Sequence, residues 1–152
     1  MKKKYETMPL DEQLIFPIYI CSKELIRKYN SLLDKYGLTY TQFVIMMYLW
    51  DKKTSNVKKI SETMLLDSST LTPLLKKLEK KGYIARNKSL MDERNLSIEL
   101  TKEGKELEEK TSHVPLEMEE ICALNKEEVN NLRSAVTKLL TRIIEENKNE
   151  NN

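Results

Sequence analysis

The sequence predicts a mainly α-helical fold with one small antiparallel β-hairpin, in a single domain of residues 1–152. Two observations indicate the helices: apolar residues recur at helical spacing near both ends of the chain, and the run over 43–50 is apolar on almost every side. A third observation indicates the hairpin, because two short stretches, 83–88 and 96–100, flank a polar loop. A chain of 152 residues can bury a substantial core.

The first long helix is predicted between residues 11 and 35, where apolar side chains recur at helical spacing. Pro17 lies inside this pattern and lacks a backbone donor. The regular helix therefore either begins near Phe16 or kinks there. Gly37 has the position of a C-cap, so we expect the segment to end at this glycine.

The second helix is the apolar one, and its beginning is marked by a capping box. Thr39 would cap the helix, and Gln42 would reach back to the backbone of the cap residue. Because the following run is apolar nearly all round, this helix should lie at the centre of the core. We expect a polar loop over residues 51–56 after it.

Two further helices are predicted after residue 100. Thr101 is a natural N-cap for a helix that runs to about Thr111, and Pro115 then interrupts or restarts the helix. Asn125 and Glu128 form a second capping box, which begins a helix with apolar residues at helical spacing nearly to the end of the chain.

Residues 55–104 carry the sharpest functional signal, and we call them the reading head. A short amphipathic helix and a turn occupy 55–67, a longer basic helix occupies 68–82, and the predicted hairpin follows. Helix, turn, helix and hairpin is the order of a winged helix-turn-helix. In that arrangement one helix enters the major groove of DNA and the hairpin reaches the flanking backbone. Long helices outside this region need a partner surface, so we expect 1–37 and 111–148 to form a helical dimerisation region.

Most of the predicted DNA contacts lie on the basic helix and the hairpin. Lys76, Lys77, Lys80 and Lys81 fall on adjacent faces, and the positive end of the helix should add to the attraction for phosphates. We expect Pro73 to be tolerated because it lies in or near the first turn. Asp92 is placed to aim Arg94 towards a narrow minor groove. We assign backbone positioning to Lys58, Lys76, Lys77 and Lys88, and sequence specificity to Ser68, Ser69, Thr70, Thr72 and Arg94.

Charge and composition fit this assignment. Residues 57–105 carry eleven Lys or Arg against seven Asp or Glu, whereas residues 106–152 carry six against eleven. No run of about 20 apolar residues could span a bilayer, and no apolar stretch follows the lysines at the start to make a signal peptide. We therefore expect a cytoplasmic location. Two cysteines and His113 make no metal or cofactor motif, so we expect neither.

The chain resembles the MarR family of winged-helix regulators over nearly its whole length. Three motifs carry the resemblance: Asp67-Ser-Ser-Thr-Leu-Thr-Pro-Leu-Leu-Lys-Lys-Leu-Glu-Lys-Lys-Gly82, Asp92-Glu-Arg94 and Leu100-Thr-Lys-Glu-Gly104. The organic-hydroperoxide-sensing (OhrR-like) branch is indicated by Gln13-Leu14, Phe16, Tyr19, Ser22-Lys-Glu24, Tyr29, Leu32-Leu-Asp34 and Leu38-Thr-Tyr40. The resemblance implies a homodimeric repressor that is not an enzyme. It would bind a pseudo-palindromic operator with half-sites about 34 Å apart.

The chain departs from that branch at its sensing position. The branch carries a reactive cysteine in a Gln-Leu-Cys-Phe motif, and here Ile15 occupies the place of that cysteine. An isoleucine cannot be oxidised, so we expect no response to organic peroxide through position 15. Tyr19, Tyr29 and Tyr40 remain, and in the branch the latter two hydrogen-bond the thiol of the partner subunit. A pocket of these tyrosines and Ile15 could bind a small apolar or phenolic effector.

The two cysteines leave alternatives open. Cys21 is a possible redox thiol, but it lies about 240° round the helix from Ile15, and we favour a buried structural cysteine. The acidic residues beside Cys122 disfavour a thiolate there. One alternative function is a thiol peroxidase that uses Cys21. Another is a helical protein-interaction module without DNA binding.

Overall fold

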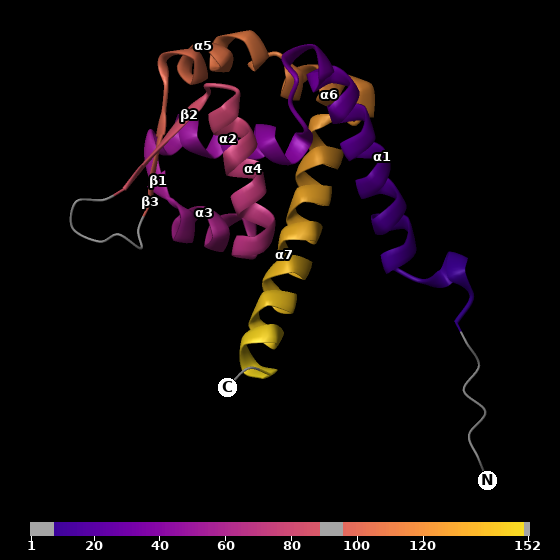
Figure 1. Ribbon diagram of the computed structural model, residues 1–152. Coiled ribbons are helices and arrows are strands. Elements are labelled where there is room, and N and C mark those ends of the chain that lie inside the picture. The colour runs from indigo at the N-terminus through magenta and orange to yellow at the C-terminus, as the bar shows by residue number, and fades with distance from the viewer. Residues whose placement is uncertain (1–7, 89–95, 151–152) are drawn as a thin grey trace. The chain divides into compact units, whose positions relative to one another are not determined.

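The computed structural model describes residues 8–88 and 96–150 of the chain (Figure 1). By contact density the chain divides after Val114 into two compact units. Along the chain the elements are η1 (Leu10–Glu12), α1 (Ile15–Leu33), η2 (Asp34–Tyr36), α2 (Tyr40–Lys52), β1 (Thr54–Asn56), α3 (Val57–Met64), α4 (Ser68–Lys80), β2 (Ile84–Lys88), β3 (Leu96–Leu100), α5 (Lys102–Thr111), α6 (Val114–Cys122) and α7 (Lys126–Glu150).

Helix α1 begins and ends as its proline and glycine dictate. It starts at Ile15, so Pro17 falls in the first turn, where its missing N–H costs no helical hydrogen bond. The first of the two expected alternatives is therefore correct. At the other end the 3-10 turn η2 leads into Gly37, whose φ of 63° is left-handed. The Gly37 N–H donates to the carbonyl of Asp34 at 2.8 Å, which confirms the predicted C-cap.

The predicted N-caps are all present. Thr39 and Gln42 form the reciprocal capping box at the start of α2, with bonds of 3.4 and 3.1 Å. Thr101 caps α5. At the start of α7, the Asn125 side chain accepts from the backbone of Glu128 at 3.0 Å, and the Glu128 carboxylate accepts from the backbone of Asn125 at 2.8 Å. These local signals were readable because each requires only residues three positions apart.

The hairpin is confirmed, but it belongs to a three-stranded sheet. β2 pairs antiparallel with β3, and β1 pairs with the other edge of β3, giving the order β1-β3-β2. The expectation of a polar loop over 51–56 was therefore wrong. α2 continues to Lys52, and the short polar strand β1 follows. Its partner strand is some forty residues away in the sequence, so no periodicity within β1 could reveal the pairing.

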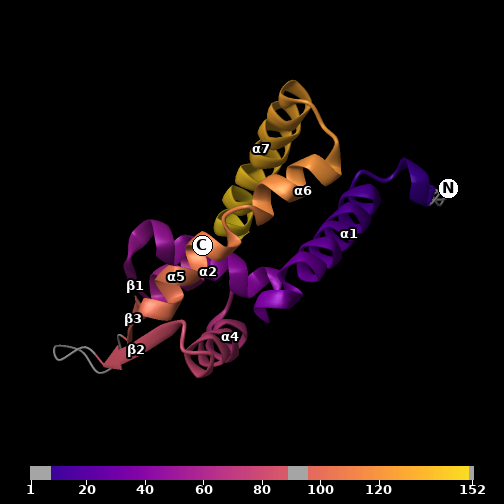
Figure 2. The same ribbon diagram turned by 90° about the horizontal axis from the view of Figure 1, so that it is seen from above.

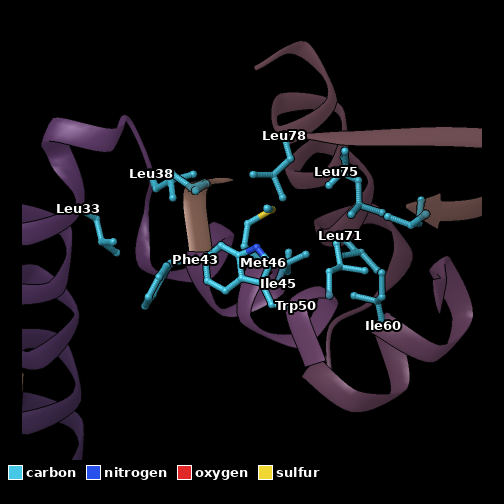
Figure 3. Packing of buried hydrophobic residues seen from close by; sticks show 14 of the residues in the cluster. Leu33, Leu38, Phe43, Ile45, Met46, Trp50, Ile60, Leu71, Leu75 and Leu78 are labelled. Carbon is cyan, nitrogen blue, oxygen red and sulfur yellow. The ribbon is translucent and has the colours of Figure 1, made fainter. Parts of the chain in front are cut away.

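The core of the first unit is built around α2, as predicted. Phe43, Ile45, Met46 and Leu49 are all 1% exposed or less, and α3 and α4 close over them (Figure 3). Burying each such side chain contributes roughly 1.5–3 kcal/mol. Trp50 also packs here, edge-on to the Phe43 ring, and its Nε1 donates to the carbonyl of Gly104 at 2.8 Å.

The start of α5 lies against the base of the hairpin. A Cβ atom at Gly104 would stand 2.0 Å from the carbonyl oxygen of Tyr83, so only glycine allows this approach. The Thr101 hydroxyl donates to the carbonyl of Gly82, and the Thr101 N–H donates to the carbonyl of Tyr83. The strands β2 and β3 thus leave the body of the unit from a fixed base.

Helices α1 and α7 differ from the core elements because many of their apolar side chains are exposed. Leu14, Ile15 and Tyr19 at the start of α1 are each more than half exposed. Only the C-terminal part of α1 adjoins α2 and η2, and the rest extends away in both views (Figures 1 and 2). In α7, considered by itself, a stripe of apolar residues is about half exposed: Leu132, Val136, Leu140 and Ile143. No helix within 8–88 or 96–150 is long and apolar enough to cross a membrane.

Candidate nucleic-acid interface

Helix α4 has one buried face and one cationic face. Leu71, Leu75 and Leu78 are at most 1% exposed and hold the helix against α2 and α3. Lys76 and Lys77 lie on the outer side and are exposed, as is Lys80 one turn further on. The buried leucines fix the helix, so the lysines are presented from a rigid element. α4 contacts β2, and Figure 2 shows the two side by side.

The turn between α3 and α4 sets the position of α4. It contains no glycine, although Leu65 adopts a left-handed conformation with φ of 51°. The Leu66 N–H donates to the carbonyl of Ser61 at 3.1 Å, and the Ser61 hydroxyl donates back to the carbonyl of Leu66. A left-handed leucine is unfavourable, so these two bonds and the packing of both helices must hold the turn.

Asp67 caps the N-terminus of α4 and engages its first turn. One carboxylate oxygen accepts from the Thr70 N–H at 2.7 Å and from the Ser69 hydroxyl, and the other accepts from the Thr70 hydroxyl at 3.2 Å. The Ser69 hydroxyl above all, and then the Thr70 donors, lower the pKa of Asp67 below its ordinary value of 3.8. The carboxylate therefore stays ionised at neutral pH.

This cap changes the expected chemistry at the helix start. The Ser69 and Thr70 hydroxyls already donate to Asp67, so in this arrangement their oxygens are left as acceptors. The Asp67 charge also offsets part of the positive helix end, and the expected attraction of this end for phosphates stays a prediction. Ser68 is exposed, and Thr72 is half-buried.

Pro73 does not lie in the first turn of α4. It is the sixth residue of the helix, which runs through it from Ser68 to Lys80. The prediction that it is tolerated as a first-turn proline was therefore wrong. The ring leaves the Ser69 carbonyl without its helical donor. Because Pro73 is exposed, water can satisfy that carbonyl.

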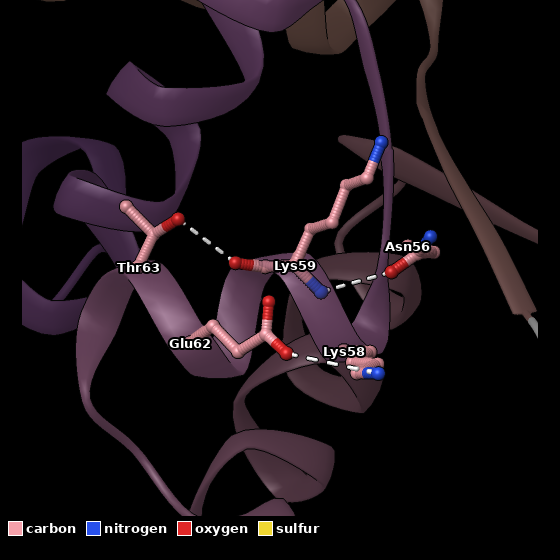
Figure 4. A network of polar contacts seen from close by, with 5 residues as sticks. All are labelled: Asn56, Lys58, Lys59, Glu62 and Thr63. Carbon is pink, nitrogen blue, oxygen red and sulfur yellow. Dashed lines mark hydrogen bonds and ion pairs between the residues drawn. The ribbon is translucent and has the colours of Figure 1, made fainter. Parts of the chain in front are cut away.

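Lys58 lies at the start of α3, the other helix of the reading head. Asn56 caps this helix by accepting from the Lys59 N–H at 2.9 Å (Figure 4). The Lys58 ammonium faces Glu62 one turn later at 3.9 Å, with both side chains mostly exposed. Such a surface pair contributes little, so Lys58 can exchange this carboxylate for a phosphate at small cost.

Only part of the predicted wing lies within the described residues. Lys88 is the last residue of β2 and is paired in register with Leu96. Asp92 and Arg94 lie outside the described residues, so their predicted ion pair and the minor-groove role of Arg94 stay predictions.

Arg86 on β2 is a residue that the sequence analysis missed. Its Nε and terminal nitrogen both reach one carboxylate oxygen of Glu79 on α4, at 2.8 and 2.7 Å. The Arg86 side chain is 20% exposed, so this pair is better shielded than the surface pairs. It ties the wing strand to the recognition helix. In the sequence, the acidic Glu79 and the basic Arg86 lie on either side of Gly82, which is the only sign of this ion pair. The pairing becomes visible only in the fold, where the chain turns back at Gly82.

The predicted effector residues are only partly brought together within one chain. The rings of Tyr29 and Tyr40 lie 4.5 Å apart between centroids and are tilted by 38°, and the Asn30 side chain accepts from the Tyr40 N–H at 2.7 Å. Ile15 begins α1 and lies fourteen residues before Tyr29, a rise of about 21 Å along the helix. Tyr19 is also in the exposed N-terminal half of α1.

Both cysteines are exposed in the single chain. For Cys21 this contradicts the expected buried structural cysteine, because the face of α1 that carries it is not covered by the rest of the unit. Cys122 ends α6. Within the described part of the chain, no group of three His, Cys, Asp or Glu side chains is arranged to hold a metal ion.

A cationic helix set by a fixed turn, with a paired strand beside it, defines a winged helix-turn-helix protein. Residues 27–111 match the family described as "Transcriptional regulator SarA/Rot". The chain is 42% identical over 137 residues to the HTH-type transcriptional regulator SarZ of Staphylococcus epidermidis, covering 90% of this chain and 93% of that protein. The chain belongs to the MarR-family winged-helix regulators of the OhrR-like type.

Two further comparisons extend over most of the chain. The organic hydroperoxide resistance transcriptional regulator of Bacillus subtilis is 39% identical over 147 residues, which are 97% of this chain and all of that protein. Among solved structures, reduced AbfR bound to DNA superposes with a TM-score of 0.75 at 29% identity. That match covers 89% of this chain and 94% of the other. The recognised motifs and the observed fold therefore lead to the same family.

Proposed function

We propose that this protein is a transcriptional repressor that binds a pseudo-palindromic DNA operator as a homodimer and performs no catalysis. The observation that carries the proposal is the two-sided α4, whose leucines are buried while Lys76 and Lys77 are presented to solvent beside a wing strand. Relatives named as transcriptional regulators and a neighbour solved on DNA support it. Such a protein acts where the chromosome is, in the cytoplasm.

Homodimerisation is supported by the apolar residues that the single chain leaves uncovered. Exposed side chains follow both α1 and α7 at helical spacing, and large continuous apolar patches are rare on monomeric proteins. We assign 1–37 and 111–148 to the dimer contact, with 55–104 reading DNA. Two copies related by a two-fold axis would place two α4 helices on successive turns of a duplex, about 34 Å apart.

We assign different roles in DNA binding to the residues of the reading head. Lys58, Lys76, Lys77 and Lys88 would position the protein on phosphates, which carry no sequence information. Base readout would come from Ser68 and Thr72 as donors or acceptors, from Ser69 and Thr70 as acceptors, and from Arg94 in the wing. Pro73 lies on the same exposed surface, and Asp92 would aim Arg94. An Arg94→Ala variant should weaken operator binding substantially; wild-type affinity in a titration at fixed salt would refute the wing assignment.

We propose that release from DNA is not triggered at position 15. Ile15 has no group that an organic peroxide can oxidise, whereas the exposed Cys21 and Cys122 do. AbfR has been solved in overoxidised and disulfide forms, which shows that oxidation occurs in a protein of this fold. The contact between the Tyr29 and Tyr40 rings offers a second route, through a small apolar or phenolic effector. Either signal would act by changing the distance between the two heads.

Selection of bound sequences from random duplexes tests the central proposal. The expected product is an inverted repeat with half-sites about ten base pairs apart. A selection that yields no repeat, with binding that is insensitive to salt, would favour the interaction module without DNA binding.

Release from the selected duplex then tests whether oxidation of a cysteine is the signal. Peroxide-induced release should be absent in a Cys21→Ser, Cys122→Ser double variant, and release that survives would contradict thiol sensing. Catalytic turnover of peroxide by the wild type, lost in Cys21→Ser, would favour the peroxidase.

A further inference from the structure

The turn between α1 and α2 accepts hydrogen bonds from the end of the recognition helix. Lys81, the residue after α4, donates from its Nζ to the carbonyl of Gly37. Tyr83, two residues further on, donates from its hydroxyl to the carbonyl of Tyr36 at 3.4 Å. The two acceptors are consecutive residues of one turn, so α4 and the base of the wing are attached at the same place. Figure 2 shows the C-terminal end of α1 approaching α4.

This turn is a firm point of attachment. The Gly37 N–H is bonded to the carbonyl of Asp34 at 2.8 Å, and the Leu38 N–H is bonded to the carbonyl of Leu33 at 3.3 Å. Leu33 and Leu38 are buried in the core on either side of it. The Tyr36 hydroxyl also donates to a carbonyl at the end of α5, at 2.7 Å. The Gly37 carbonyl is therefore held from several directions before Lys81 reaches it.

Lys81 lies at the wrong end of α4 for base readout. The N-terminal residues of such a helix usually contact the bases. Ser68 begins this helix and Lys81 follows its thirteenth residue, which places them about 20 Å apart along the axis. An ammonium at the C-terminus is also favoured by the helix dipole without any phosphate. The bond to Gly37 thus accounts for Lys81 better than a DNA contact does.

We propose that Lys81 is a positioning residue that sets the angle between α4 and α1 and thereby the spacing of operator half-sites that the dimer accepts. The inference rests on the proposed function, because α1 carries part of the assigned dimer contact. Whatever fixes α4 relative to α1 fixes α4 relative to its copy in the second subunit. A misfit of a few Å against the groove repeat loses contacts in one half-site. Lys81 would thus act on specificity without touching DNA.

The test uses Lys81→Met in the full-length protein and duplexes whose half-sites are moved one base pair closer or further apart. The wild type should prefer its selected spacing over either neighbour by about tenfold, since one base pair shifts and rotates a half-site. Lys81→Met should reduce that preference to about threefold or less. It should keep the wild-type dependence of affinity on salt, because no phosphate contact is removed.

Lys77→Met is the matched control, since it also removes one exposed lysine, four residues earlier in α4. Its expected effect is a similar loss at every spacing, with a salt slope shallower by about 1.8, because the dimer loses one phosphate contact in each subunit. If Lys81→Met also loses affinity equally at every spacing and has a shallower salt slope, Lys81 is a phosphate contact and the proposal is wrong. A spacing preference equal to that of the wild type would also overturn it.

A measurement without DNA separates this proposal from the proposed function. Amide hydrogen exchange of Gly37 and Leu38 should be faster in Lys81→Met than in the wild type, and unchanged in Lys77→Met. If the wild type binds no duplex, the proposed function fails, and these amides alone decide whether Lys81 holds the turn. Equal exchange in both variants and the wild type would refute the attachment.

Discussion

In the reading head Leu71, Leu75 and Leu78 of α4 are at most 1% exposed, whereas the apolar stripe of α7 is about half exposed at a similar helical spacing. Both helices carry an apolar stripe, so periodicity alone does not distinguish them. The difference is that α4 packs on α2 and α3 of its own unit, while the unit that contains α7 leaves the stripe of α7 about half exposed. The comparison indicates that the reading head is stable within one subunit, whereas the apolar stripe of α7 is available to pack against a second subunit.

The largest effect is expected from substitutions that prevent α7 from packing against a second subunit. A Val136→Glu, Leu140→Glu variant places two charges in the half-exposed stripe, and a buried unpaired charge costs several kcal/mol. We expect monomers by sedimentation and a loss of about 100-fold or more in affinity for a duplex with two half-sites. Lys138→Glu, on the opposite face, is the control and should remain dimeric. A dimeric double variant would show that α7 is not the contact.

Leucine-to-alanine changes in the two helices sharpen the same contrast. Leu78→Ala removes a fully buried side chain and should lower the free energy of unfolding by about 2–5 kcal/mol at any protein concentration. Leu140→Ala should cost less, and its effect should depend on protein concentration because it acts through association. Chemical denaturation at two concentrations measures both. Equal, concentration-independent losses would contradict the distinction between the helices.

A smaller effect is expected where the wing is attached to the head. Arg86→Met leaves Glu79 without its partner on β2, so the wing strand loses one of its ties to α4. We expect affinity for the selected duplex to fall about tenfold, with the helical content unchanged. Lys102→Met, which breaks an exposed pair with Glu106 at 3.9 Å, is the control and should bind normally. Equal binding by both variants would remove Arg86 from the interface.

The smallest effect is expected at Asp67, and it is a gain. Asn caps a helix as well as Asp does, so Asp67→Asn keeps the cap and removes a negative charge beside the DNA-facing surface. Affinity should rise about fivefold at low salt. Unchanged or weaker binding would place Asp67 away from the phosphates.

The same variant has a defined pH dependence. The pKa of Asp67 is lowered in the folded state, so its ionised form stabilises the protein above the ordinary value of 3.8. That contribution is lost as the pH falls through the lowered pKa. The difference in unfolding free energy between wild type and Asp67→Asn should therefore be constant near neutrality and shrink below pH 3.8. A difference that is flat across this range would show that the cap does not depend on charge.

Local signals in the sequence predicted most of the fold, and non-local pairings account for what was missed. The capping residues Thr39, Thr101 and Asn125 act within one turn, so their spacing sufficed. The strand β1 and the Arg86 ion pair depend on segments brought together by the fold, and neither has a pattern of its own. The exposure of Cys21 was missed for a different reason, since the apolar pattern of α1 predicts burial without saying which chain provides it.

The central claim is that the exposed lysines of α4 face DNA phosphates, and the dependence of binding on salt tests it most directly. Affinity for the selected duplex should be measured by fluorescence anisotropy over a range of salt concentrations, for the wild type and for a Lys76→Gln, Lys77→Gln variant. The variant loses two phosphate contacts in each subunit, four in the dimer, so the slope of log affinity against log salt should become shallower by about 3.6. A slope identical to that of the wild type would contradict the account.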